Sequence, residues 1–160
     1  MKKKLILLVV VLIAIDQVSK WLATSHLPFH QAVEVIPFFS LYLTHNKGVA
    51  FSMLEGFGNV GLIVMTLAIT AFMIFLWRRV PSHQQLASLG FALVVSGAIG
   101  NLIDRATLGH VVDFFLFHTS TWAFAVFNIA DSFINLGAIA IVAEELAILR
   151  PKSEKSNSES

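Results

Sequence analysis

Two aspartates in the last third of the chain have the residue type and the surroundings for acid–base chemistry. Asp113 stands in the apolar run of residues 111–115, and Asp131 stands in a long apolar segment between Asn128 and Asn135. No Lys or Arg lies within two helical turns of Asp131. An unpaired acid in a membrane-spanning segment is by default a functional candidate. The structural alternative is a protonated acid that hydrogen-bonds a neighbouring helix.

The two acids are expected to converge, because a short connection joins the segments around them and makes those segments antiparallel neighbours. Two carboxylates in a partly desolvated site cannot both ionise easily, so one pKa rises and the pair shares a proton. One carboxylate can then take a proton from water while the other donates one to a substrate carbonyl, as in aspartic proteases. The pattern therefore indicates hydrolysis of a peptide bond.

Two charged residues lie inside the first apolar segment. Asp16 and Lys20 are four residues apart and share one helix face. A charge inside a membrane span costs at least about 2.5 kcal/mol on insertion scales, so each needs a partner. We favour a mutually neutralising ion pair over a catalytic role. Further along the chain, Asp104 stands next to Arg105, and we expect a structural ion pair there as well.

Other catalytic chemistries have less support. The sequence has no cysteine, which removes thiol nucleophiles and thiolate metal sites. His26 and His30 are separated by Pro28, and no His-Glu-x-x-His motif occurs, so we expect no metal site. Ser19 and Lys20 point about 100° apart on a helix, which disfavours a serine–lysine pair.

The composition places these residues in a membrane. Of the 160 residues, 56% are hydrophobic and only 13% are charged, which is about half the charged fraction of soluble domains, and the mean hydropathy is +0.77. Four apolar segments approach the roughly 20 residues that a bilayer core requires. They cover approximately residues 5–24, 60–77, 86–103 and 123–149. We expect an all-α membrane protein with four transmembrane helices, in a single domain over residues 1–150.

The positions of the basic residues favour one orientation in the membrane. Three lysines precede the first segment, two arginines separate the second from the third, and three basic residues follow the fourth. The other two connections hold one basic residue each. By the positive-inside rule, both termini are cytoplasmic, and residues 25–59 and 104–122 face outward. Residues 151–160 form a polar cytoplasmic tail that we expect to be disordered.

The first outer segment is too long and too apolar for a simple loop. Residues 39–44 alternate apolar and polar side chains, as a half-buried strand does. Residues 46–48 supply turn chemistry, and residues 49–53 resume an apolar pattern. We expect a small extracytoplasmic β-like platform on the membrane surface. The alternative is an amphipathic segment that packs against the helix ends.

Several motifs, in order along nearly the whole chain, resemble those of the lipoprotein signal peptidases, or signal peptidase II. Each motif alone is weak, but all of them together in a four-span protein of this length are specific. Val49 departs from the small residue expected at its position. The motifs are Asp16–Lys20, Asn46–Ser52, Gly97–Arg105, Gly109–Phe114 and Phe127–Ser132.

The resemblance implies an aspartic endopeptidase of the bacterial cytoplasmic (inner) membrane. Its substrates would be prolipoproteins with a diacylglyceryl-modified cysteine, and it would cut before that cysteine. Asp113 and Asp131 match the catalytic pair of the family. The residues that would bind the substrate or shape the site are Asp16, Lys20, Asn46, Gly48, Asn101, Arg105 and Asn128. The platform would hold the peptide while lipid chains sit among the helices. We expect a functional monomer that needs no cofactor and binds no nucleic acid.

A binding or transport module is the rival function, in which Asp16, Asp113 and Asp131 would form a path for protons or cations. Four spans and 160 residues are few for a transporter that does not oligomerise. The sequence also lacks the paired repeats and interrupted helices that are typical of transporters. Cleavage of a lipid-modified precursor peptide by the purified protein would distinguish the two functions.

Overall fold

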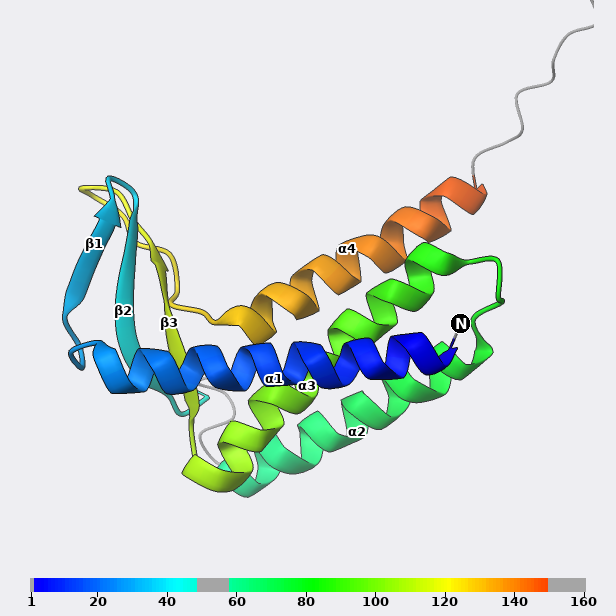
Figure 1. Cartoon of the computed structure of the whole chain (residues 1–160), viewed down its shortest axis with the longest axis horizontal. Coiled ribbons are helices and arrows are strands. Elements are labelled where there is room, and N and C mark those ends of the chain that lie inside the picture. The colour runs from blue at the N-terminus through cyan, green and yellow to red at the C-terminus, as the bar shows by residue number, and fades with distance from the viewer. Residues whose placement is uncertain (1, 49–57, 150–160) are drawn as a thin grey trace, which may run out of the picture.

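The computed structural model describes residues 2–48 and 58–149, which form four helices and one small sheet (Figure 1). Each of the four helices is long and apolar enough to cross a membrane, which confirms the predicted number of spans. The apolar residues 49–53, with Val49, and the tail 151–160 lie outside the described residues. In chain order the elements are α1 (Lys2–His26), β1 (Ala32–Ile36), β2 (Phe39–Asn46), α2 (Gly58–Arg79), α3 (Gln85–Leu108), β3 (Val111–Phe117) and α4 (Ile129–Leu149).

The helix α3 is the centre of the bundle. The other three helices pack on α3, whereas α1 and α2 make almost no contact with each other. Most of α3 is buried, and the other helices expose most of their apolar surface, as lipid-facing helices do. Glycines let α3 and α4 approach closely, because a methyl group at Gly90 would collide with the backbone of Gly137.

A three-stranded antiparallel sheet in the order β1-β2-β3 lies at one end of the bundle (Figure 1). The predicted strand is confirmed as part of β2, so the expected platform is a true sheet. The sheet packs on the end of α1 through a small core of Ala23, Leu43, Val112 and Phe114. β1 is exposed along its whole length, whereas the first four residues of β3 are buried.

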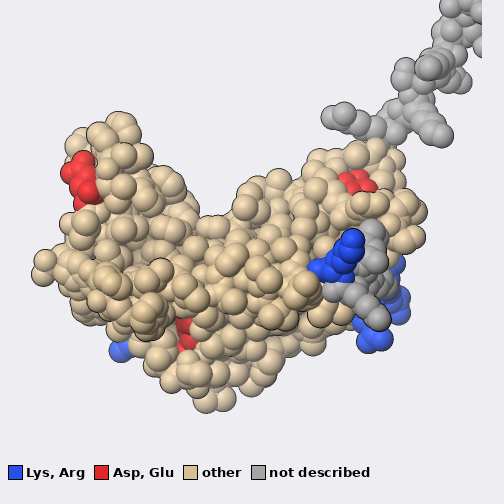
Figure 2. Space-filling model, in the orientation of Figure 1, with Lys and Arg blue, Asp and Glu red and all other residues tan. Residues whose placement is uncertain are grey.

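The charged residues are distributed unevenly between the two ends of the bundle. The N-terminus and the connection between α2 and α3 lie at the end opposite the sheet (Figure 1). Lys and Arg side chains gather at that same end (Figure 2). Two of the basic segments that were used to predict the orientation, the N-terminus and the α2–α3 connection, therefore share one end of the molecule, and the sheet occupies the other.

The fourth helix begins later than the sequence indicated. It starts at Ile129 rather than near residue 123, because the preceding residues run alongside β3. The backbone N–H groups of Phe115 and Phe127 donate to each other's carbonyl oxygens, at 2.8 and 3.0 Å. Asp131 is therefore the third residue of α4 and lies at the sheet end of the bundle, close to β3.

Candidate active site

Asp113 is the third residue of β3, and only 1% of its surface is exposed. In the antiparallel register, Thr44 of β2 is opposite Asp113, and Asn46 lies two residues further along β2, opposite Val111. Asn46 is therefore within reach of Asp113. The side-chain amide of Asn46 donates to Asp113 Oδ2 at 3.0 Å, and that of Asn128 donates to Oδ1 at 2.6 Å. Both carboxylate oxygens are therefore held by amide donors.

Asp131 is held by the N-terminal cap of α4. Asn128 Oδ1 accepts the backbone N–H of Asp131 at 3.0 Å, and Asp131 Oδ2 accepts the backbone N–H of Asn128 at 3.2 Å. This reciprocal arrangement is a capping box, with Asn and Asp in the places usually taken by Ser or Thr and Glu. The other oxygen, Oδ1, accepts the side-chain amide of Asn101 at 2.8 Å.

Asn128 thus contacts both acids, which belong to different elements of the fold. Its side chain is fully buried, and its amide nitrogen also lies 3.1 Å from Asn101 Oδ1. The structure brings Asp113 and Asp131 to one place, as the short connection between the segments around them led us to expect. It brings Asn46, Asn101 and Asn128 to the same place.

The pKa of Asp113 is raised from 3.8 to about 6. Burial of the carboxyl group is the largest cause, and the negative charge of Asp131 is the second. The hydrogen bonds from Asn46 and Asn128 act in the opposite direction and lower the pKa, because they stabilise the ionised form. A carboxyl group with a pKa near 6 can hold a proton or release it close to neutral pH.

Behind the two acids, Lys20 connects α1 to α3. Its Nζ atom lies 2.9 Å from Asp16 and 2.9 Å from Asp104, and it donates to Asn101 Oδ1 at 2.9 Å. Because the oxygen of Asn101 accepts from Lys20, its NH2 group is turned toward Asp131. Lys20 therefore fixes the orientation of the amide that holds Asp131.

The predicted pair of Asp16 and Lys20 is present, but the predicted pair of Asp104 and Arg105 was wrong. Asp104 pairs with Lys20 and also accepts the backbone N–H of Val112 at 3.1 Å. Adjacent residues on a helix point about 100° apart, so Arg105 faces another direction. Asp104 therefore belongs to the network behind the two acids.

Gln17 is a residue of this network that the sequence interpretation missed. Its amide donates to Asp16 Oδ2 at 3.2 Å and to Asp104 Oδ1 at 3.0 Å, so it joins the two carboxylates that flank Lys20. Asp16 also accepts the backbone N–H of Ala130 at 3.0 Å, in the first turn of α4. The sequence signal that could have identified Gln17 is its polar side chain, which stands next to Asp16 in an apolar segment.

Gly48 and Arg105 lie at the edge of the site. Gly48 has a φ of 89°, a left-handed conformation that favours glycine, and its N–H donates to Asn46 Oδ1 at 2.8 Å. This bond turns the NH2 group of Asn46 toward Asp113. The charge of Arg105 interacts with both Asp113 and Asp131. Its Nη1 donates to the carbonyl of Asn101 at 3.4 Å, and its buried Nε makes no hydrogen bond to residues 2–48 or 58–149.

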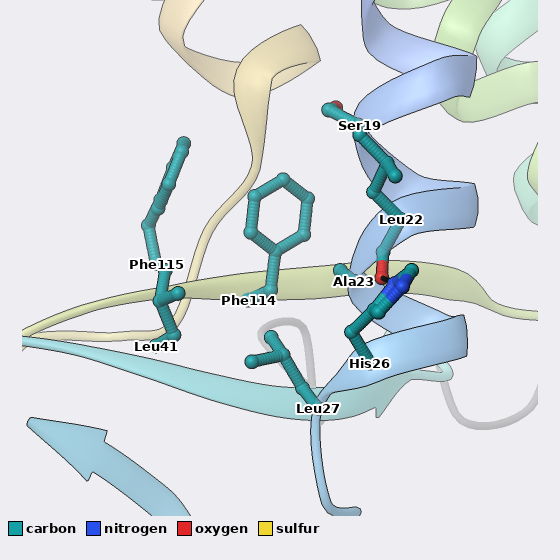
Figure 3. Close-up of a pocket in the computed structure, with 8 residues that line it drawn as sticks. All are labelled: Ser19, Leu22, Ala23, His26, Leu27, Leu41, Phe114 and Phe115. Atoms are coloured by element: carbon teal, nitrogen blue, oxygen red, sulfur yellow. Dashed lines mark hydrogen bonds between the residues drawn. The ribbon is translucent and has the colours of Figure 1, made fainter.

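An apolar pocket of about 440 Å³ lies on the α1 side of the sheet (Figure 3). Phe114 and Phe115, which follow Asp113, form one wall with Leu41, and the last two turns of α1 form the other. Phe114 and Leu27 point into the space between the helix and the strands (Figure 3). The lining suits a hydrocarbon chain, because almost all of it is apolar.

Four spanning helices with two amide-bound acids at one end form the arrangement expected of a membrane protease of the aspartic type. The family model described as signal peptidase (SPase) II matches residues 8–147. A lipoprotein signal peptidase of Sinorhizobium fredii is 49% identical over 150 residues, which cover 94% of this chain and 89% of that protein. One of Mesorhizobium japonicum is 50% identical over 140 residues, or 88% of this chain and 83% of that protein. The chain belongs to the signal peptidase II family.

The fold is similar to that of two solved structures, each described as a bacterial membrane enzyme. One has a TM-score of 0.83 at 29% sequence identity, and the match covers 97% of this chain and 94% of that one. The other has a TM-score of 0.81 at 29% identity, over 94% and 95% of the two chains. Membership of a peptidase family decides against the alternative of a path for protons or cations.

Proposed function

We propose that Asp113 and Asp131 are the catalytic pair with which this membrane protease removes signal peptides from prolipoproteins. The observation that carries the proposal is that one buried asparagine, Asn128, binds both carboxylates at the sheet end of the bundle. Burial and mutual repulsion favour the form in which the pair holds a single proton. That form contains one general base and one general acid.

The hydrolysis then follows from the shared proton. The ionised carboxylate takes a proton from a water molecule as the water oxygen attacks the scissile carbonyl carbon, and the protonated carboxyl gives its proton to the carbonyl oxygen. In the second step, the newly protonated carboxyl donates to the leaving nitrogen, and the other carboxylate takes a proton from one hydroxyl group of the intermediate. The C–N bond breaks, and the pair again holds one proton.

The polar residues around the pair would position it. Asn46 and Asn101 each donate to one acid, and each is oriented by a second hydrogen bond, from Gly48 and from Lys20 respectively. Asp16 would act through Lys20 and through the first turn of α4. Arg105, whose charge interacts with both acids, would shape the polar side of the site.

We propose that the substrates carry a diacylglyceryl group on the cysteine that follows the cleavage point. The pocket beside Phe114 supports this assignment, because an acyl chain in it would lie next to the strand that carries Asp113. The platform would hold the peptide in an extended form. One copy of the chain supplies both acids and all three asparagines, which supports a functional monomer.

We further propose that the protein lies in the inner membrane, as a single domain, with both termini in the cytoplasm and the active site near the outer face. The basic end of the bundle supports this orientation. The far end of the sheet exposes large apolar side chains that suit the lipid headgroup zone, where aromatic residues are enriched. They include Phe38, Phe117, Trp122 and Phe124.

The proposal is tested by cleavage of a diacylglyceryl-modified precursor peptide by the purified protein in detergent. Mass spectrometry should find a product that begins at the lipid-bearing cysteine. Asp113→Asn and Asp131→Asn should abolish this product but still bind the precursor. Glu145→Gln, which changes an exposed carboxyl group near the end of α4 that is remote from the sheet, should cleave normally. Asp104 would not be a suitable control, because it contacts Lys20 and the backbone of Val112. A product from either Asn variant at an appreciable rate would reject the assignment.

A further inference from the structure

A furrow runs between α1 and α2, and neither the two acids nor the asparagines that bind them are among its lining residues. It exists because both helices pack on α3 but make almost no contact with each other. The furrow encloses about 540 Å³, within the roughly 300–1,000 Å³ that is usual for ligand sites. Its floor is formed by Val95 and Ile99 of α3, and one wall is formed by Ile6 and Val9 of α1.

The charged residue at the mouth of the furrow distinguishes it from an ordinary apolar gap. Arg78, in the last turn of α2, lines the furrow together with Trp77 and is the one charged residue among its described lining residues. The next residue, Arg79, is engaged elsewhere, because its guanidinium carbon lies 4.3 Å from the ring centroid of Phe75. The furrow therefore combines a hydrocarbon-lined interior with a single cation at its rim.

The position of the rim matches the headgroup level of a bilayer. Arg78 is in the last turn of α2, at the end of the bundle opposite the sheet (Figure 1), and Lys and Arg side chains gather at this end (Figure 2). Trp is enriched at the boundary between hydrocarbon and headgroups, which places Trp77 at this level. Basic pockets between transmembrane helices are suited to the phosphate headgroups of anionic lipids.

We propose that the furrow binds an anionic phospholipid, with one acyl chain along the floor of α3 and the phosphate group on Arg78. The lipid would fill the gap between α1 and α2 and so hold α1 against α3. This site is separate from the two acids, and the proposal does not depend on their catalytic roles.

The test compares two headgroups on the purified, delipidated full-length protein. Native mass spectrometry counts the lipids retained, and a thermal melt measures the stabilisation that binding gives. Phosphatidylglycerol should be retained as one tightly bound copy and should raise the melting temperature. Phosphatidylcholine, which has the same chains but no net charge, should bind about fivefold more weakly.

Two arginine variants, and one variant with a larger side chain inside the furrow, complete the experiment. Arg78→Gln should lower the affinity for phosphatidylglycerol about fivefold, whereas Arg79→Gln, its neighbour, should retain most of the affinity. Val9→Phe should weaken the binding of both lipids, because the added ring occupies the furrow. Equal losses in the two arginine variants would show diffuse attraction to a basic surface and would overturn the proposal. Equal retention of the two lipids, or a dimer that buries Val9 without lipid, would overturn it as well.

Discussion

Replacing Asn128 by serine should separate the two roles that this residue performs in the site. Its oxygen caps α4 by accepting the N–H of Asp131 at 3.0 Å, and its amide nitrogen lies 2.6 Å from Asp113 Oδ1. Serine is as good an N-terminal cap as asparagine, so the hydroxyl group can accept the same N–H. Serine is shorter and has no amide, so the donor to Asp113 is lost. Alanine removes both roles.

The expected magnitudes follow from these contacts. A hydrogen bond to a charged group contributes about 1.5–3 kcal/mol, so its loss should lower kcat/KM by about 10- to 100-fold in both variants. Loss of a helix cap costs about 0.5–2 kcal/mol, so Asn128→Ala should be less stable than Asn128→Ser by that amount. The pKa of Asp113 should also rise above about 6, because the lost donor stabilises the ionised form.

The assay measures kcat/KM against pH for the wild type and both variants, with thermal melts in parallel. The wild-type profile should be bell-shaped, with its alkaline limb near the upper pKa of the pair in the free enzyme, about 6. Both variants should move this limb to higher pH. A serine variant with wild-type kcat/KM, or a limb that moves to lower pH, would refute the assigned role of Asn128.

Two further predictions concern stability and orientation. The pKa of Asp113 is raised in the folded state, so the stability from its protonation is fully present below about pH 3.8 and is lost as the pH rises through about 6. Asp113→Asn should therefore melt at a higher temperature than the wild type at pH 7. The difference in melting temperature should be smaller at pH 4. An equal difference at both pH values would contradict the raised pKa of Asp113. Reporter domains fused after residues 118 and 82 should be extracytoplasmic and cytoplasmic respectively; the reverse result would invert the proposed orientation.

Local spacing was enough to predict part of this structure. The four spans follow from the lengths of the apolar segments, and the pair of Asp16 and Lys20 follows from their four-residue separation on a helix. The strand β2 includes residues 39–44, whose apolar and polar side chains alternate in the sequence, but its burial does not alternate, because Ser40 and Leu43 are its buried residues. The two acids were identified because a charge in an apolar segment needs a physical reason.

Features decided by tertiary contacts could not be predicted in the same way. β3 is a nearly continuous apolar run around Asp113, because its first half is buried on both faces and shows no alternation. The apolar residues 123–127 fit a helix or an extended segment equally well. The signal that α4 starts at Ile129 was the three-residue spacing of Asn128 and Asp131, which is that of a capping box. The partner of Asp104 is Lys20 of α1, which lies 84 residues earlier in the chain, and no local sequence pattern predicts that contact.

The rate of precursor cleavage by the two single aspartate variants and by the double variant tests the central claim most directly. If Asp113 and Asp131 act as one unit, either Asn substitution should remove nearly all cleavage, because each carboxylate has a role that the other cannot take over. The double variant should then be little slower than the slower single variant, as expected for groups that act together. Binding of the precursor, measured separately, should persist in all three. Substantial turnover by Asp113→Asn or Asp131→Asn protein would contradict the two-aspartate mechanism.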